Sequence, residues 1–221
     1  VVGDPKRPFR IAVLGDSLAD GLWGRLYRGH IRQKERIVIE RFAVNSAGFT
    51  AYNFEAQLAK ALEKGPIDVI VFQVGANDRQ RECAVGNYKQ WAVFRTAKWH
   101  TLYRQNVQQF LAVLQEKKIP IAWVGLPIMR KDDANEDARM MNGIFRSAIG
   151  EIGGVFIDIW PITANKEQEY DPYFEDEGGR KKRFRADDGI HFTDAGYEYL
   201  TRHVLKAMRE KMPDLRLWQA E

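Results

Sequence analysis

The feature that most constrains the fold is an alternation of short apolar runs with longer segments of helical periodicity. Short runs of this kind are typical of strands that are buried on both faces of a parallel sheet. Five runs have this character: Arg10–Leu14, Ile37–Val44, Ile67–Val74, Ile119–Gly125 and Val155–Ile159. The segments between them carry apolar residues on one helical face. They are Ser17–Tyr27, Ala51–Glu63, Trp99–Lys117, Asp137–Ile152 and Thr193–Lys211.

Strands that alternate with helices predict a parallel sheet covered by helices on both faces. Right-handed crossovers then leave few possible topologies. We predict a single three-layer α/β/α domain over residues 1–221, of flavodoxin-like type with a five-stranded parallel sheet. Residues 1–9 are expected to be an N-terminal extension. Residues 79–98 and 167–186 are expected to be insertions that line a pocket at the carboxyl ends of the strands, where open α/β sheets place ligands.

Composition excludes several classes of protein. No stretch of about 18 apolar residues is present, so we expect no membrane span. The single cysteine, Cys83, excludes an intrachain disulfide and a cysteine metal cage. The formal charge of +4 is a mild excess, which fits either a solvated surface or an attraction to acidic polymers. We expect no nucleic-acid partner and no cofactor, and the sequence does not set the oligomeric state.

A serine follows the first predicted strand, in the sequence Gly15-Asp16-Ser17-Leu18. A serine at a strand-to-helix turn presents its hydroxyl at the carboxyl edge of the sheet. There it lies beside the free amides of a helix N-terminus, and those amides can stabilise a developing oxyanion. The alternative is that Ser17 only caps the helix, which is a frequent role of serine.

A second candidate lies before the last predicted helix, in Asp188-Gly189-Ile190-His191. A histidine can take the proton from a serine hydroxyl, and a carboxylate can then fix its tautomer. An aspartate three residues earlier on a turn can reach the ring of His191. The alternative is a surface histidine next to a helix cap.

Two further turns follow the second and third predicted strands. Asn45-Ser46-Ala47-Gly48 offers the Gly48 amide, and Gly75-Ala76-Asn77-Asp78 offers the Asn77 side-chain amide. Each turn is ordinary by itself. Because the carboxyl ends of parallel strands meet at one edge, the turns together predict a nucleophile, a base, an orienting carboxylate and oxyanion donors at one site.

These four blocks resemble the SGNH (GDSL) hydrolase superfamily, named for its Ser, Gly, Asn and His. The resemblance spans residues 10 to 200. It implies Ser17 as nucleophile, His191 as base, Asp188 as orienter, and an oxyanion hole formed by Ser17, Gly48 and Asn77. The stretches 184–193, 125–129 and 158–160 are further similar to a bacterial subgroup, the DUF459-like proteins. Because such proteins are often exported, the resemblance implies a periplasmic or exported location, although residues 1–10 contain no apolar signal core.

The resemblance implies a serine esterase that removes a small acyl group, such as an O-acetyl group, from an acylated small molecule or a cell-envelope glycan. The alternatives are a glycan O-acetyltransferase, which would use the same residues, and a catalytically silent glycan-binding domain. A metal-dependent phosphoesterase is a third alternative, with Asp16, Asn77, Asp188 and His191 as possible ligands.

Several other residues have two interpretations each. Asp16, Asp78 and Arg79 flank the candidate residues and could contact substrate, and the two aspartates could instead be turn scaffolding. The basic run Arg180–Arg183, with Arg185 after it, could hold an anionic glycan or form a solvated loop. Three aromatic residues could form a sugar-stacking platform or pack an insertion onto the core: Trp91, Phe94 and Trp99. We expect no role for His30, His100 and His203.

Overall fold

A five-stranded parallel sheet forms the centre of the molecule. The computed structural model describes residues 6–33, 35–50, 52–79, 83–85, 90–175 and 178–219. The strand order is β2-β1-β3-β6-β7. The sheet consists of β1 (Phe9–Gly15), β2 (Ile37–Ala43), β3 (Val69–Gln73), β6 (Ile121–Val124) and β7 (Val155–Ile157). The predicted fold class and all five predicted strands are confirmed.

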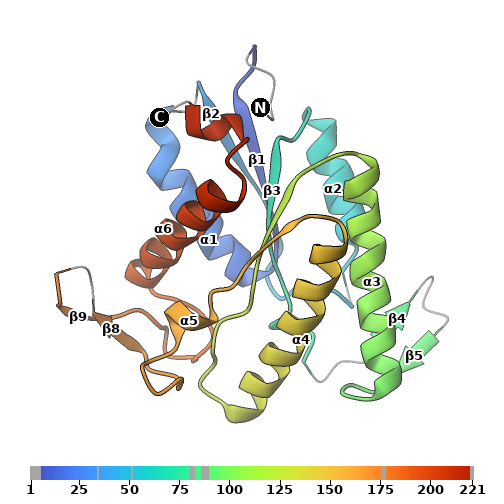
Figure 1. Ribbon diagram of the computed structural model, residues 1–221, viewed down its shortest axis with the longest axis vertical. Coiled ribbons are helices and arrows are strands. Elements are labelled where there is room, and N and C mark those ends of the chain that lie inside the picture. The colour runs from blue at the N-terminus through green and yellow to red at the C-terminus, as the bar shows by residue number, and fades with distance from the viewer. Residues whose placement is uncertain are drawn as a thin grey trace.

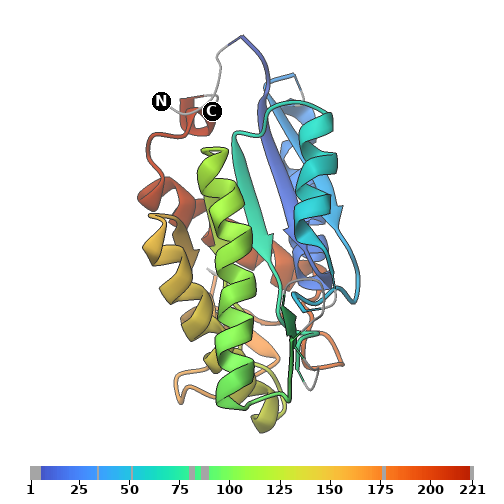
Figure 2. The ribbon, with the colours of Figure 1, turned by 90° about the vertical axis from the view of Figure 1, so that its right-hand side faces the viewer.

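Helices cover both faces of this sheet (Figures 1 and 2). The two helices α1 (Ser17–His30) and α6 (Asp194–Lys211) pack together on one face. The other face is covered by α2 (Phe54–Glu63), α3 (Ala97–Glu116) and α4 (Asp132–Glu151). The predicted helices match these five, although α4 begins five residues before the predicted start. Position 51, the predicted start of α2, lies outside the described residues.

The central strands are apolar because both of their faces are buried. Every residue of β1, β3 and β6 is buried. Beneath α2 and α3, aromatic side chains interlock. The Phe72 and Trp123 rings meet edge to face at 4.5 Å, and Phe49 stacks on Trp123 at 5.9 Å. This rigid layer supports the turns that leave the carboxyl ends of the strands.

Two small hairpins lie beyond the carboxyl ends of the strands, in the lower half of Figure 1, with β8 and β9 on the left and β4 and β5 on the right. One pairs β4 (Cys83–Val85) with β5 (Gln90–Ala92), and the other pairs β8 (Tyr173–Glu175) with β9 (Lys181–Arg183). They occupy the segments predicted as insertions, of which residues 80–82, 86–89 and 176–177 lie outside the described part. The predicted N-terminal extension, residues 1–9, overlaps β1 by one residue, because Phe9 belongs to that strand. Residues 1–5 lie outside the described part of the chain.

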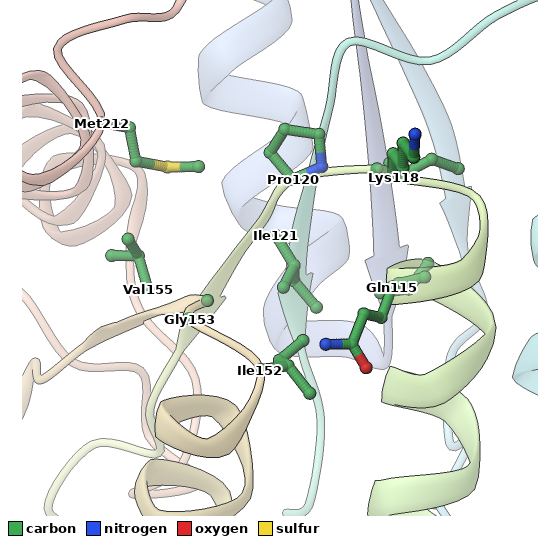
Figure 3. A pocket seen from close by; sticks show the side chains of 11 residues that line it. Gln115, Lys118, Pro120, Ile121, Ile152, Gly153, Val155 and Met212 are labelled. Atoms are coloured by element: carbon green, nitrogen blue, oxygen red, sulfur yellow. The ribbon is translucent and has the colours of Figure 1, made fainter.

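A cavity of about 280 Å³ lies at the other end of the sheet (Figure 3). Its lining includes Pro120, Ile121, Ile152 and Val155, which are at or near the amino ends of β6 and β7. It is therefore far from the turns at the carboxyl ends. Within the described residues, none of the helices combines the length and the apolar character that crossing a bilayer demands.

Candidate active site

The turn between β1 and α1 presents Ser17 as the first residue of its helix. Gly15 adopts a φ of +132°, and a Cβ there would lie 1.8 Å from the Gln73 carbonyl oxygen, so only glycine fits this turn. Asp16 is the N-cap of α1, and its side chain accepts a hydrogen bond from the Leu18 amide at 2.9 Å. The capping role considered for Ser17 is thus filled by Asp16, and the Ser17 hydroxyl points elsewhere.

The Ser17 hydroxyl meets the ring of His191. Ser17 Oγ lies 2.7 Å from His191 Nε2, although the two residues are 174 positions apart. On the opposite side of the ring, His191 Nδ1 lies 2.6 Å from Asp188 Oδ2. When Nδ1 carries the proton, its N–H donates a hydrogen bond to the carboxylate, and Nε2 is free to accept a hydrogen bond from the hydroxyl. The hydroxyl, the imidazole and the carboxylate are therefore connected in series.

The carboxylate of Asp188 is fixed by its own loop. Its Oδ1 accepts from the amides of Ile190 and His191, at 2.8 and 2.9 Å. Burial acts to raise the pKa of Asp188, but the hydrogen bonds from the His191 ring and these two amides outweigh it and lower the pKa to about 2. Asp188 is consequently ionised at neutral pH.

The turns after β2 and β3 lie against the Ser17 turn. Asn77 Nδ2 donates to the Ala47 carbonyl at 2.9 Å and lies 3.5 Å from Asp16 Oδ2. Gly48 approaches the third turn so closely that a Cβ would lie 2.6 Å from Asp78 Oδ1. The structure therefore brings together the three blocks that contain Ser17, Gly48 and Asn77.

Asp78 is fully buried and serves as a junction between these turns. It accepts from the Phe49 and Thr50 amides at 2.8 and 3.0 Å, from the Thr50 hydroxyl at 3.0 Å, and from the Tyr103 hydroxyl at 2.8 Å. Burial raises its pKa. A buried carboxyl with four donors has the geometry of scaffolding, and it does not fit direct contact with substrate.

Asp16 is also fully buried. Burial raises its pKa to about 7, neighbouring Asp78 adds to the increase, and the amides of Leu18, Gly75 and Ala76 oppose it. The scaffolding interpretation of Asp16 fits this position, and the substrate-contact interpretation does not.

Arg79 is turned towards α4. Its Nε donates to Asp137 at 2.9 Å, and its Nη2 lies 2.8 Å from Asp133. Asp137 is itself buried and also accepts from Arg95 at 2.7 Å. These ion pairs fix the chain immediately after Asn77, and they leave Arg79 occupied by carboxylates of this chain.

The aromatic residues considered as a sugar platform divide into two groups. Trp99 is fully buried, stacks on Tyr103 at 4.5 Å and meets Phe94 edge to face at 4.8 Å. Phe94 and Trp99 therefore pack the segment after the β4–β5 hairpin onto the core. Trp91 lies on the hairpin and is 51% exposed.

The basic run also divides, and one expectation about it is wrong. Residues 180 to 183 are exposed, and Arg183 pairs with Asp187. Arg185 is instead fully buried, with its hydrogen bonds going to main-chain carbonyls. Its charge therefore does not belong to the exposed basic surface. Sequence reasoning missed this because an arginine that follows four basic residues is normally on the surface.

The donor set of a metalloenzyme is not assembled in the described part of the chain. No group of three or more His, Cys, Asp or Glu side chains there is arranged to hold a metal ion. Asp16 in particular is a buried residue of the Ser17 turn, and its carboxyl group accepts hydrogen bonds from main-chain amides.

Comparisons with known proteins agree with this architecture. Residues 10–207 match the family described as "Protein of unknown function (DUF459)". Among curated proteins none matches the chain. Similar solved structures include a lipase/acylhydrolase from Enterococcus faecalis, with 17% identity, a TM-score of 0.62 and coverage of 92% of this chain and 96% of the other. A GDSL-like lipase from Bacteroides thetaiotaomicron has 13% identity, a TM-score of 0.63 and coverage of 95% and 92%.

A mutant of an acetyl-xylooligosaccharide esterase from Geobacillus is also similar, with 14% identity, a TM-score of 0.64 and coverage of 94% and 95%. Identities this low establish a shared fold. The match to the family covers nearly the whole described chain, and the fold agrees with it. The chain therefore belongs to the DUF459 family and has the three-layer α/β fold of the SGNH hydrolases.

Proposed function

We propose that the chain is a serine esterase that hydrolyses a small acyl ester through an acyl-enzyme on Ser17. The observation that carries this proposal is the series of two short contacts, 2.7 Å from Ser17 Oγ to His191 Nε2 and 2.6 Å from His191 Nδ1 to Asp188 Oδ2. A nucleophile, a base and an orienting carboxylate in this order are the parts that acyl transfer requires.

The first half of the reaction forms the acyl-enzyme. The Ser17 hydroxyl attacks the ester carbonyl carbon while His191 Nε2 takes its proton, and Asp188 stabilises the imidazolium that results. The tetrahedral intermediate collapses by breaking the bond to the alcohol oxygen, which takes the proton from His191. Water then attacks the acyl-enzyme by the same route and releases the acid and free Ser17.

Three donors are available for the oxyanion. The Ser17 amide is at the N-terminus of α1, where main-chain N–H groups have no partner within the helix. The Gly48 amide and Asn77 Nδ2 come from the neighbouring turns. Asn77 has two N–H groups. One donates to the Ala47 carbonyl, and the other has only a 3.5 Å contact with Asp16, which is long for a hydrogen bond. That second N–H can be directed at an oxyanion.

An O-acetyl group on a cell-envelope glycan is the substrate we propose. Two of the similar structures are described as an acetyl xylan esterase and an acetyl-xylooligosaccharide esterase. The exposed ring of Trp91 is on the hairpin at the same end of the sheet as Ser17, and such rings can stack on sugars. The proposal includes a periplasmic or exported location, where such a glycan is found.

Hydrolysis is favoured over acetyl transfer by the openness of the base. The side chains of His191 and Asp188 are 34% and 47% exposed, so water can reach the imidazole. The imidazole can then activate that water for attack on the acyl-enzyme. A transferase is expected to exclude water from this point. The complete series of three residues argues against a catalytically silent domain.

The test is a series of aryl esters with acyl chains of increasing length, measured with wild type, Ser17→Ala and the control Ser147→Ala. Ser147 is an exposed serine on α4. We expect the highest kcat/KM for the acetate, loss of turnover in Ser17→Ala, and wild-type turnover in Ser147→Ala and in the presence of a chelator. Turnover of Ser17→Ala equal to that of wild type would contradict the proposal.

A second measurement separates hydrolysis from transfer. An O-acetylated glycan is incubated with the enzyme and an unacetylated acceptor glycan, and the products are analysed. Free acetate is expected. Accumulation of acetylated acceptor in its place would identify a transferase.

A further inference from the structure

Arg185 is a buried cation in the loop that carries the candidate base. Its side chain is fully inaccessible, whereas residues 180 to 183 just before it are exposed. The loop from Ala186 to His191 closes on itself, because the Ala186 amide donates to the His191 carbonyl at 2.9 Å. Arg185 and Phe192 form an antiparallel bridge at its base. The guanidinium is therefore enclosed by the loop that presents Asp188 and His191.

The guanidinium of Arg185 donates hydrogen bonds to main-chain carbonyl oxygens of this loop. Nη2 donates to the Ile190 carbonyl at 2.9 Å, and longer contacts join Nη2 to the Gly189 carbonyl at 3.5 Å and Nε to the His191 carbonyl at 3.4 Å. Nη1 donates to the Ile128 carbonyl at 2.6 Å, in the chain after β6. One side chain thus ties the three residues that end at His191 to the body of the sheet.

Two aromatic rings hold the guanidinium in place. Its central carbon is 5.0 Å from the centre of the Tyr170 ring and 4.6 Å from that of Phe192. Such cation–π contacts are most favourable where water is excluded. The guanidinium of Arg185 is therefore held both by contacts with two rings and by hydrogen bonds to main-chain carbonyls.

A buried charge of this kind is costly. Burial lowers the pKa of Arg185 to about 10, which still leaves it charged at neutral pH. Taking a cation out of water costs several kcal/mol unless hydrogen bonds compensate. An apolar side chain could fill the same volume without that cost, but it could not bind three successive carbonyl groups. The benefit of the arginine lies in the geometry of the loop.

We infer that Arg185 is a positioning residue, which fixes the loop from Asp188 to His191 so that the imidazole reaches Ser17. The inference rests on the proposed function, since it assigns Arg185 a task in that reaction. The 2.7 Å contact between Ser17 and His191 joins two distant parts of the chain and depends on the position of this loop. Displacement of a reacting group by about 1 Å can cost about 100-fold in rate.

The test compares Arg185→Lys and Arg185→Met with Arg10→Lys as a matched control. Arg10 is also buried and donates to the Ala61 carbonyl at 2.8 Å and to the Gly65 carbonyl, but it is at the start of β1, far from Ser17. Arg185→Lys is expected to lower kcat by about 10- to 100-fold with KM nearly unchanged. Arg185→Met is expected to lose more, and Arg10→Lys to lose stability while keeping kcat.

A spectroscopic measurement accompanies the kinetics. We expect the proton between His191 Nδ1 and Asp188 Oδ2, which are 2.6 Å apart, to give a low-field proton NMR resonance that reports the geometry of the loop independently of turnover. We expect this resonance to shift or broaden in both Arg185 variants and to be unchanged in Arg10→Lys. A folded Arg185→Lys with wild-type kcat and an unchanged resonance would overturn the inference.

Two further cases are covered: that neither Arg185 variant folds, and that wild type has no esterase activity. If neither Arg185 variant folds, Tyr170→Leu removes one ring from the guanidinium and is expected to lower kcat by a few-fold at constant KM and to shift the resonance; no change in either would overturn the inference. If wild type hydrolyses no ester, the proposed function fails. The resonance still shows whether Arg185 fixes the loop, so the two failures are distinguishable.

Discussion

Replacing Asn77 by alanine separates a catalytic contribution from a structural one. The variant removes an amide that donates to the Ala47 carbonyl at 2.9 Å and has a second N–H available to an oxyanion. The lost hydrogen bond contributes about 1 kcal/mol to stability. Since domains are stable by about 5–15 kcal/mol, the variant is expected to remain folded.

The catalytic loss is expected to be much larger. Removal of one oxyanion donor costs about 10²- to 10³-fold in kcat, which corresponds to about 3–4 kcal/mol in the transition state. Steady-state hydrolysis of an aryl acetate measures kcat, and urea unfolding measures stability. If the donor acts on the oxyanion, kcat falls by this factor while the free energy of unfolding falls by only about 1 kcal/mol.

Asn53→Ala is the matched control. Asn53 caps α2 by accepting from the Ala56 amide at 2.9 Å, and it is exposed. Loss of an N-cap also costs about 1 kcal/mol. The control should therefore lose similar stability and retain wild-type kcat. A kcat for Asn77→Ala within about threefold of wild type, against the factor expected for an oxyanion donor, would refute the reasoning.

Three further substitutions, one of them with a control, test the site and its surroundings. Asp188→Asn should keep the fold and lower kcat by about 10⁴-fold, because an amide no longer fixes the tautomer of the imidazole; a near wild-type kcat would contradict the series. Gly48→Ala should lower both kcat and stability, because the new Cβ would lie 2.6 Å from Asp78 Oδ1. The control is Gly143→Ala on α4, where a Cβ would meet nothing within 4 Å. This control should be as active as wild type and slightly more stable. Burial raises the pKa of Asp16 to about 7, above the ordinary 3.8, so the folded state holds this proton more tightly. That stabilisation is complete below about pH 4 and is lost as the pH rises through about 7. Urea unfolding should show wild type losing stability relative to Asp16→Asn over this range, and a constant difference would argue against a raised pKa.

The sheet was predictable because its central strands β1, β3 and β6 are buried on both faces. Burial of whole strands such as β3 gives a nearly continuous apolar run, which is a clear pattern in the sequence. The hairpin strands β8 and β9 are three residues each and mostly exposed, so neither leaves a periodic signal. The short helix α5 (Trp160–Thr163) is likewise a single turn, too short to show helical periodicity.

Local sequence motifs predicted the residues of the site, but tertiary packing determines whether the neighbouring charged residues are buried or exposed. Ser17, Gly48 and Asn77 come together because they follow β1, β2 and β3, whose ends converge at one edge of the parallel sheet, whereas His191 reaches Ser17 from the loop before α6. Burial of Asp78 depends on Tyr103, which comes from α3 and has no relation to the turn in sequence. Arg185 is buried because two rings and four carbonyls surround it, and none of these contacts leaves a pattern that a reader of the sequence could detect.

The proposed function requires that the Ser17 hydroxyl be a nucleophile activated by His191. Incubation with a fluorophosphonate probe, followed by peptide mass spectrometry, tests it directly. We expect a single adduct on the peptide that contains Ser17, absent from Ser17→Ala and formed much more slowly in His191→Ala. An adduct on another residue, or equal labelling of the Ser17→Ala variant, would contradict it.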